Sequence, residues 1–447
     1  MGWKFSHFGD QLGRGSGIGE LMDDLGHALA TGGDEVCMLG GGQPAHLPEL
    51  DAVWRRRCQE LLEEPGRIEA VVGNYEPPLG NQAFRESIAA LLQRRFGWNL
   101  SFENVAVTAG GQTGLFFLFN TLAGPDSLAG VSAETQPRQV LLPLVPEYIG
   151  YANQSVSGPL FRSIRPQLEL IGDHQFKYRV DFDAIEVDDK VGAICVSRPT
   201  NPTGNVLTDF EIDHLHELAS SADVPLIIDQ AYGSPFPDVI FREIKPRWDE
   251  QMILTLSLSK LGLPGTRTAV VIARPEIIQA MGSMNSIVGL ANSNLGQAIV
   301  KPMLDSGEVC DLTSQVIRPF YQRKSEFAQR CVREIFSDQL PYRIHLSEGA
   351  FFLWMWFEDL PIHSQELYRR LKERKVLVVP GHHFFFGLED ACRSEVEPQV
   401  AGNRMNQANW KHQEECIRVS FAMPDEVIRR GIEIVGEEIE RAYQSAT

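Results

Sequence analysis

Residues 252–267 read MILTLSLSKLGLPGTR. The run MILTLSLS is short, apolar and suited to a buried strand, yet Lys260 follows it directly, before a Gly/Pro-rich turn. Similar apolar runs recur between segments with helical patterns, namely VAVTAG (105–110), VLLP (140–143), AICVS (193–197), PLIID (225–229) and TAVVIA (268–273). Short apolar strands that alternate with helices are typical of an α/β sheet that is mostly parallel and buried on both faces.

The chain of 447 residues is too long for one ordinary core. A long helical pattern runs from Glu308 to Phe336, and four strand candidates follow it: YRIHL, AFFLWMWF, VLVVP and CIRVSFA. This order indicates a smaller α+β domain. We expect a large domain over residues 51–307 and a small one formed by residues 1–50 and 308–447. The polar segment from Gly387 to Glu415 is expected to be a long surface loop.

Composition excludes several classes of function. Lys+Arg 41 against Asp+Glu 59 gives a net charge of −18, without the basic stripe that nucleic acid requires. The longest apolar run, AFFLWMWF, is shorter than the roughly 20 residues of a membrane helix, and the start MGWKFSHFGD lacks the apolar core of a signal peptide. Seven scattered cysteines without a C-x-x-C pair fit a reducing compartment. We expect a cytoplasmic protein with no membrane or nucleic-acid partner.

Polar residues follow two of the predicted strands in turns. After VAVTA, Gly110 and Gly111 would let the backbone approach a ligand, and the N–H groups of Gly111, Gln112 and Thr113 would form an anion site suited to one phosphate. After AICVS, Asn201 in N-P-T-G lies where an amide would hold a small molecule. The alternative for the glycine pair is a tight strand-to-helix turn, and the alternative for N-P-T-G is an ordinary turn, in both cases without a ligand.

A carboxylate and an amine follow two further strands. Asp229 ends PLIID, where burial requires a cationic or protonated partner, and Tyr232 lies three residues on. A buried Lys260 would have a lowered pKa and a free amine able to form a Schiff base. The alternatives are that Asp229 merely caps a helix and that Lys260 is a surface lysine. Together the strand ends offer an anion cradle, an amide, a carboxylate and an amine, which are the parts that a pyridoxal phosphate site requires.

The motifs S-x-S-K-x-G-L-P-G-x-R, N-P-T-G, D-x-A-Y and I-R-V-S-F, in this order, resemble those of the fold-type I aminotransferases that use pyridoxal 5′-phosphate. The match runs over nearly the whole chain. The opening SHFGDQLGRGSGIGELMDDLG further resembles the start of the valine–pyruvate aminotransferases. The resemblance implies a large mostly parallel sheet domain, a smaller α+β domain, and a homodimer with shared active sites.

The resemblance also implies roles for the strand-end residues. Lys260 would bind the cofactor covalently and, once released, move a proton. Asp229 would pair with the pyridine nitrogen, and Asn201 and Tyr232 would donate hydrogen bonds to the 3′-oxygen of the cofactor. Lys260, Asp229 and Tyr232 are thus the expected catalytic residues.

The phosphate of the cofactor would be bound by the backbone of Gly111 and Gln112 and by the side chains of Ser257 and Arg267, of which only the arginine offers bidentate geometry. Tyr148 would stack on the ring, although Tyr151 is an alternative for that role.

Tyr75 would reach the phosphate of the neighbouring subunit, which makes a dimer obligatory. Arg418 in CIRVSFA would bind the substrate α-carboxylate together with Asn201 and the backbone around Gly41, in the loop MLGGGQP (38–44).

The histidines do not predict a metal site. His382 and His383 are adjacent in the loop VLVVPGHHFFFG. Adjacent histidines in a loop are more often incidental than metal ligands or catalytic bases. His214 and His216 lie two apart on a helical pattern and therefore point to different faces. We expect no bound metal.

The substrate follows from a missing arginine. Relatives acting on dicarboxylates supply a second arginine after the lysine segment, whereas this chain has no Lys or Arg between Arg274 and Lys301. We expect a neutral small or branched amino acid such as valine or alanine, with pyruvate and 3-methyl-2-oxobutanoate as the 2-oxo acids. The alternatives are a cysteine-conjugate β-lyase of the same fold and a non-catalytic regulator that binds pyridoxal phosphate. About 40 residues precede the loop LGGGQP, too few for an added DNA-binding domain.

Overall fold

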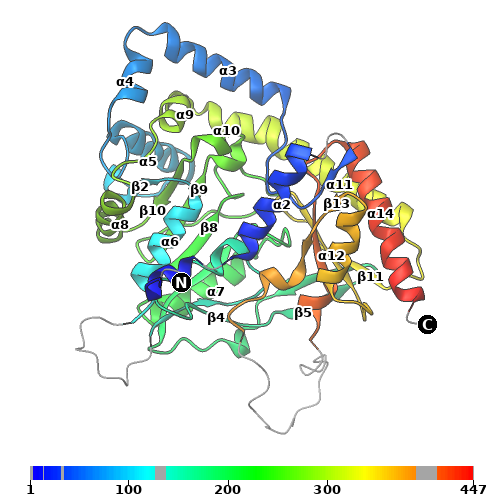
Figure 1. Ribbon diagram of the computed structural model, residues 1–447. Coiled ribbons are helices and arrows are strands. Elements are labelled where there is room, and N and C mark those ends of the chain that lie inside the picture. Colours follow the sequence, from blue (N-terminus) through cyan, green and yellow to red (C-terminus); the bar gives the residue numbers. More distant parts are fainter. Residues whose placement is uncertain (1–3, 14, 32–34, 126–136, 389–409, 446–447) are drawn as a thin grey trace.

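The computed structural model describes residues 4–13, 15–31, 35–125, 137–388 and 410–445 (Figure 1). The α-helices of this part of the chain are α1 (His7–Leu12), α2 (Gly17–Thr31), α3 (Pro48–Glu63), α4 (Arg67–Gly73), α5 (Gln82–Phe96), α6 (Gly111–Leu122), α7 (Asp209–Ser221), α8 (Pro275–Val288), α9 (Leu295–Ser306), α10 (Glu308–Leu312), α11 (Arg318–Ile335), α12 (Ser364–Glu373), α13 (His412–Glu415) and α14 (Asp425–Gln444). Short helical turns are η2 (Phe102–Asn104), η3 (Ile149–Tyr151), η4 (Phe182–Ala184), η5 (Ser259–Leu261), η6 (Pro264–Thr266), η7 (Thr313–Ile317) and η8 (Gly381–Phe384).

A seven-stranded sheet forms the larger layer of the fold, in the order β2-β10-β9-β8-β7-β3-β4. Its strands are β2 (Val105–Thr108), β3 (Gln139–Leu142), β4 (Phe161–Ser163), β7 (Val191–Ser197), β8 (Leu226–Gln230), β9 (Met252–Ser257) and β10 (Ala269–Ile272). β10 is antiparallel to both neighbours, and the other pairs are parallel. All six apolar runs found in the sequence are strands of this sheet, which confirms the expected mostly parallel α/β class.

Helices cover this sheet because its strands are apolar on both faces. Every residue of β7, β8 and β9 is buried. α6 packs on β9 and β10, and α7 packs on β7 and β8. Thr208 caps the start of α7: its hydroxyl accepts the N–H of Glu211, while the Glu211 carboxylate accepts the N–H of Thr208. These two bonds fix where the connection after Asn201 ends and the helix begins.

A second sheet of six strands has the order β14-β15-β12-β11-β6-β5. Its strands are β5 (Gln167–Ile171), β6 (Gln175–Arg179), β11 (Tyr342–His345), β12 (Phe352–Phe357), β14 (Val379–Pro380) and β15 (Cys416–Ser420). In Figure 1 these strands lie with α11, α12 and α14 on the side opposite to α5, α6 and α8. The four C-terminal strand candidates of the sequence all contribute strands.

The hairpin β5–β6 was not foreseen from the sequence. It lies within residues 51–307, the range expected for the large domain, yet β6 pairs with β11 of the second sheet. The hydrogen bonds assign residues 167–179 to the second sheet. The domain boundaries themselves stay a prediction.

The N-terminal segment runs beside the C-terminal strands. β1 (Cys37–Met38) pairs in parallel with β13 (Val376–Leu377), and the carbonyl of Leu39 accepts the N–H of Ser420 at 2.6 Å. These bonds hold the loop 38–44 next to β15. The loop expected over 387–415 falls mostly on residues 389–409, which lie outside the described residues, and residues 412–415 form α13.

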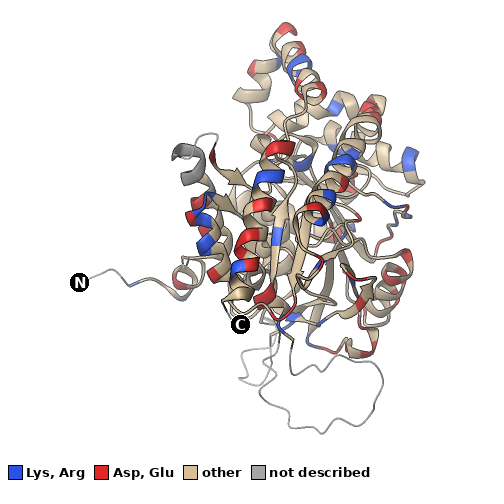
Figure 2. Cartoon of the chain, turned by 90° about the vertical axis from the view of Figure 1, so that its right-hand side faces the viewer, with Lys and Arg blue, Asp and Glu red and all other residues tan. Residues whose placement is uncertain are grey.

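The surface helices carry charges of both signs. Figure 2 shows acidic and basic residues interspersed along the helices of one face. Within the described ranges, no helix has the length and apolar character needed to cross a membrane. The six cysteines in those ranges are free thiols, and Cys392 lies outside them.

Candidate active site

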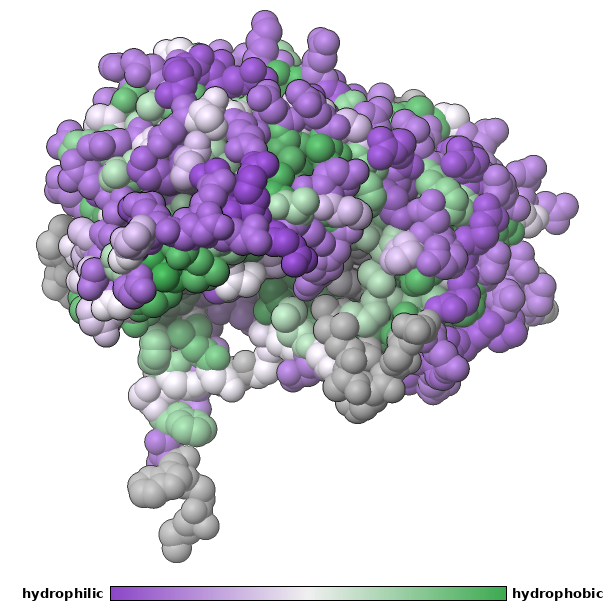
Figure 3. All heavy atoms as spheres, turned by 90° about the horizontal axis from the view of Figure 1, so that it is seen from above, coloured by the Kyte–Doolittle hydropathy of each residue, from purple (hydrophilic) through white to green (hydrophobic). Residues whose placement is uncertain are grey.

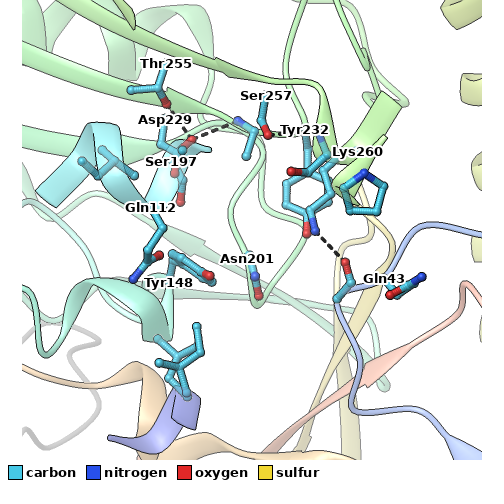
Figure 4. A pocket seen from close by; sticks show the side chains of 18 of the residues that line it. Gln43, Gln112, Tyr148, Ser197, Asn201, Asp229, Tyr232, Thr255, Ser257 and Lys260 are labelled. Carbon is cyan, nitrogen blue, oxygen red and sulfur yellow. Dashed lines mark hydrogen bonds between the residues drawn. The ribbon is translucent and has the colours of Figure 1, made fainter. Parts of the chain in front are cut away.

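A cavity of about 320 Å³ lies at the carboxyl ends of β7, β8 and β9, between the large sheet and β15. Figure 4 shows Lys260 and Tyr232 on one side of this cavity and Gln112 and Tyr148 on the other. The residues foreseen from the sequence that line it are Gly111, Gln112, Tyr148, Asn201, Asp229, Tyr232, Ser257, Lys260, Arg267 and Arg418. The structure thus brings the four predicted strand ends to one place.

Asp229 is a buried carboxylate with three donors. Its Oδ2 accepts the hydroxyl of Tyr151 at 2.6 Å, and its Oδ1 accepts the hydroxyl of Thr255 and the N–H of Ala231, each at 2.9 Å. Burial raises the pKa of Asp229, and these hydrogen bonds together with Lys260 oppose the rise. Asp229 caps no helix, since a turn follows β8. Asp229 lines the cavity, and the three hydrogen bonds hold its carboxyl group there.

Lys260 lies in η5, directly after β9, and is no surface lysine. Its Nζ donates to the carbonyl of Gly42 at 2.5 Å and lies 5.6 Å from the ring centre of Tyr232. Burial lowers the pKa of Lys260 to about 8, with Arg418 and Arg267 acting in the same direction and Asp229 against it. A large fraction of the amine is therefore neutral at mildly alkaline pH, the form that attacks a carbonyl group.

The start of α6 and Arg267 lie close together at the cavity. Gly110 has φ 87°, and a Cβ built there would lie 2.1 Å from Nη2 of Arg267, so only glycine permits this approach. No side chain caps the first N–H groups of α6. Gln112 donates to the carbonyl of Gly150 at 2.7 Å, while its Oε1 is buried without a partner. Ser257, also on the cavity, accepts the N–H of Ser259 at 3.1 Å.

Arg418 is a buried cation that no carboxylate neutralises among the residues the structure describes. It is 2% exposed, and its two terminal nitrogens donate to Oδ1 of Asn201 at 2.6 Å and to the carbonyl of Gly40 at 2.7 Å. Its Nε is buried without a partner, and the guanidinium lies 4.2 Å from the ring centre of Phe352. Burial lowers the pKa of Arg418 to about 10, which leaves it charged at neutral pH. Such a group is suited to bind an anion.

The loop 38–44 contacts both cationic residues. The carbonyls of Gly40 and Gly42 accept hydrogen bonds from Arg418 and Lys260. The residue named from the sequence, Gly41, is buried between them but does not itself line the cavity.

The two candidate ring-stacking tyrosines have different positions. Tyr148 lines the cavity, whereas Tyr151 is fully buried beneath it and bonded to Asp229. Their rings meet edge to face, with centres 5.3 Å apart. Only Tyr148 is placed to contact a ring in the cavity.

Other residues named from the sequence lie elsewhere. Tyr75 is 83% exposed and does not reach the cavity of its own chain. His382 and His383 lie in η8 with ring centres 4.0 Å apart, and burial lowers the pKa of His382 to about 4. Within the described ranges no three His, Cys, Asp or Glu side chains are grouped so as to hold a metal ion.

Comparison with known proteins identifies the family of the chain. Residues 156–435 match the family model for aminotransferase class I and II. The chain is 42% identical to the valine–pyruvate aminotransferase of Escherichia coli (strain K12) over 98% of this chain and 99% of the relative. The chain belongs to the aminotransferase class I and II family.

Solved structures of the family show the same fold. A putative amino-acid aminotransferase from Psychrobacter arcticum superposes with a TM-score of 0.90 and 39% identity, covering 99% of this chain and 100% of the other. The valine-pyruvate aminotransferase from Salmonella typhimurium LT2 superposes with a TM-score of 0.82 and 40% identity, covering 96% of this chain and 99% of the other.

In this aminotransferase, several residues of the site were missed in the sequence. Ile18, Leu21 and Met22 of α2 line the cavity, although no pattern in their segment pointed to it. Two polar residues, Thr255 in MILTLS and Glu147 in LLPLVPEYIGY, were also missed. The available signal was a polar side chain within an otherwise apolar segment.

Proposed function

We propose that the protein is a pyridoxal phosphate-dependent aminotransferase that converts valine and pyruvate into 3-methyl-2-oxobutanoate and alanine. The observation that carries the proposal is the unneutralised buried guanidinium of Arg418 in one cavity with the amine of Lys260 and the carboxylate of Asp229. Two relatives with about 40% identity bear the name valine–pyruvate aminotransferase.

The cavity fits pyridoxal phosphate. The close approach of Gly110 to Arg267 and the uncapped N–H groups of α6 would form a cradle for a phosphate group. Tyr148 would contact one face of the ring, and Asp229 would accept a hydrogen bond from its nitrogen. When bound, the cofactor supplies an electron sink for the charge that develops at the α-carbon of the amino acid.

The residues of the chain would act at separate atoms of the substrate. Arg418 would bind the α-carboxylate with the two nitrogens that now donate to Asn201 and Gly40. Nζ of Lys260 would take the proton from the α-carbon of valine, because its lowered pKa makes the neutral amine available, and in the second half of the reaction it would give a proton to the α-carbon of alanine.

The substrate side chain would meet apolar groups. Ile18 and Leu21 are half-buried at the cavity, and Met22 lies at its mouth with 59% of its surface exposed. The segment between Arg274 and Lys301 holds no Lys or Arg. A second carboxylate on the substrate would therefore find no cation of its own, which supports valine or alanine.

We also propose a cytoplasmic homodimer in which Tyr75 reaches the cavity of the partner subunit. Val72, Tyr75, Val288 and Leu290 are exposed, and the loop that carries Leu290 is tied to the one before Tyr75, since Asn294 donates to the carbonyls of residues 71 and 74. Apolar groups are exposed in patches on the face seen in Figure 3. A second copy of the chain would cover the surface around Val72, Tyr75, Val288 and Leu290.

Steady-state kinetics with purified protein test the proposal. We expect alanine to form from valine and pyruvate, with a higher kcat/KM than for aspartate and 2-oxoglutarate. Release of ammonia and pyruvate from a cysteine conjugate, without alanine formation, would indicate a β-lyase instead. Faster turnover of aspartate would contradict the substrate assignment.

A further inference from the structure

Glu147 is a fully buried carboxyl group behind the wall of the cavity. It precedes Tyr148 in the loop between β3 and η3, and it has no exposed surface. Its Oε1 accepts the N–H of Ser197 at 2.8 Å, and its Oε2 meets the hydroxyl of Ser197 and accepts the N–H of Tyr148 at 3.1 Å. Its own N–H donates to the carbonyl of Phe384 in η8 at 3.0 Å. Both carboxyl oxygens are thus used to hold two residues.

Both of those residues belong to the cavity. Tyr148 and Ser197 line it, and Ser197, the last residue of β7, pairs in register with Asp229 of β8. Figure 4 shows Ser197 next to Asp229, with Tyr148 below them on the same side as Gln112. Glu147 therefore sets the position of one wall without touching the space itself.

The surroundings of Glu147 are neutral or acidic. In the described part of the chain no Lys, Arg or His lies within ion-pair distance of it. The titratable groups that interact with its carboxyl are Asp229 on β8, Cys195 on β7 and Tyr151 in η3, and η8 contributes only the carbonyl of Phe384. Burial raises the pKa of Glu147 to about 7; the bonds from Ser197 and Tyr148 oppose this and Asp229 adds to it.

We propose that Glu147 is a positioning residue that, as a neutral carboxylic acid, holds Tyr148 and Ser197 against the ring-binding side of the cavity. The O–H of the acid donates to the hydroxyl oxygen of Ser197, and the hydroxyl hydrogen of Ser197 is then free to face the cavity. Asp229 remains the only negative charge at the floor of the site among the described residues. The assignment rests on the proposed function, because the cofactor supplies the ring.

The protonation state is tested on the full chain freed of cofactor. The pKa of the Glu147 carboxyl is higher in the folded chain, at about 7, than the ordinary value of 4.5 expected in the unfolded chain. The unfolded chain therefore releases this proton first, and the free energy of unfolding decreases as pH rises between the two values. From about pH 5 to about pH 8, the unfolding constant of the wild type should rise roughly 50-fold more than that of Glu147→Gln, which cannot ionise. Equal pH dependence of the two proteins would overturn the proposal.

The positioning role is tested by titrating the same proteins with pyridoxal phosphate and recording the circular dichroism of the bound cofactor. Glu147→Ala leaves the N–H groups of Ser197 and Tyr148 without an acceptor, so we expect about tenfold weaker binding and a smaller signal. Glu147→Gln should stay within about threefold of the wild type, because it keeps an acceptor and a neutral donor. The control is Glu415→Ala, another buried glutamate, bonded to Trp356 and remote from the cavity lining, which should bind as the wild type does.

Two results contradict the positioning role. One is wild-type affinity and signal in Glu147→Ala; the other is a loss in Glu147→Gln as large as tenfold, which decides the question even if the alanine variant fails to fold. A wild type that binds no pyridoxal phosphate would instead refute the proposed function, and the unfolding comparison would still report on the proton.

Discussion

Nη1 of Arg418 donates to Oδ1 of Asn201 at 2.6 Å, although the two residues are 217 positions apart. Asn201 follows β7 of the large sheet, and Arg418 lies on β15 of the second sheet. The bond joins the two sheets at the cavity. The remaining donor capacity of the guanidinium has no carboxylate partner in the described chain, and we propose that a substrate carboxylate binds at this junction.

Arg418→Lys should separate substrate binding from cofactor binding. Lysine keeps the charge but not the planar fork that bonds a carboxylate with two parallel hydrogen bonds. We expect kcat/KM for valine to fall about a hundredfold or more, mainly through KM, while the visible spectrum of the bound cofactor is unchanged. An unaltered KM would show that the α-carboxylate binds elsewhere.

Lys260→Ala should abolish both turnover and the visible absorption band that borohydride removes from the wild type. Turnover should drop by about a thousandfold or more, since no other amine lines the cavity within the described residues. Lys324→Ala is the matched control: Lys324 is another buried lysine, bonded to the carbonyl of Met423 at 2.5 Å, outside the cavity. A band that survives in Lys260→Ala would refute the role of this residue.

The lowered pKa of Lys260 predicts how fast the cofactor is captured. Only the neutral amine attacks a carbonyl group, and burial places half-neutralisation at a pH of about 8. Below that pH the rate at which the visible band appears, after pyridoxal phosphate is added to cofactor-free protein, should rise about tenfold per pH unit and then level off. A midpoint near the ordinary lysine value of 10.5 would contradict the burial effect.

Complementation tests the shared site. Tyr75→Ala and Lys260→Ala should each have low activity as pure proteins. In a hybrid dimer, the subunit with Tyr75→Ala keeps Lys260 and receives Tyr75 from the partner subunit, so one of its two sites is intact. We expect activity to return when the two proteins are unfolded together and refolded, with hybrid formation followed by native mass spectrometry. Hybrids without recovered activity would show that Tyr75 serves no neighbouring site.

Much of the fold was predictable because its signals are local. Each apolar run of the large sheet is buried on both faces, so its composition identifies it without knowledge of its neighbours. The hairpin β5–β6 has no such signal: β5 is largely exposed, and β6 is placed by pairing with β11, well over a hundred residues further along the chain. The residues of β6 alone do not show that it pairs with β11, although β11 itself was recognised as the strand candidate YRIHL.

The sequence by itself determined the strand ends that carry Gly110, Asn201, Asp229 and Lys260, since parallel strands bring their carboxyl ends to one edge. Only the tertiary structure decided which groups meet there from other segments: α2 at the mouth, the carbonyls of the loop 38–44 on Lys260 and Arg418, Tyr148 rather than Tyr151 on the cavity, and Glu147 behind it. Those choices depend on how side chains pack and which of them lose water. Burial and distance between residues far apart in the chain are properties of the folded molecule alone.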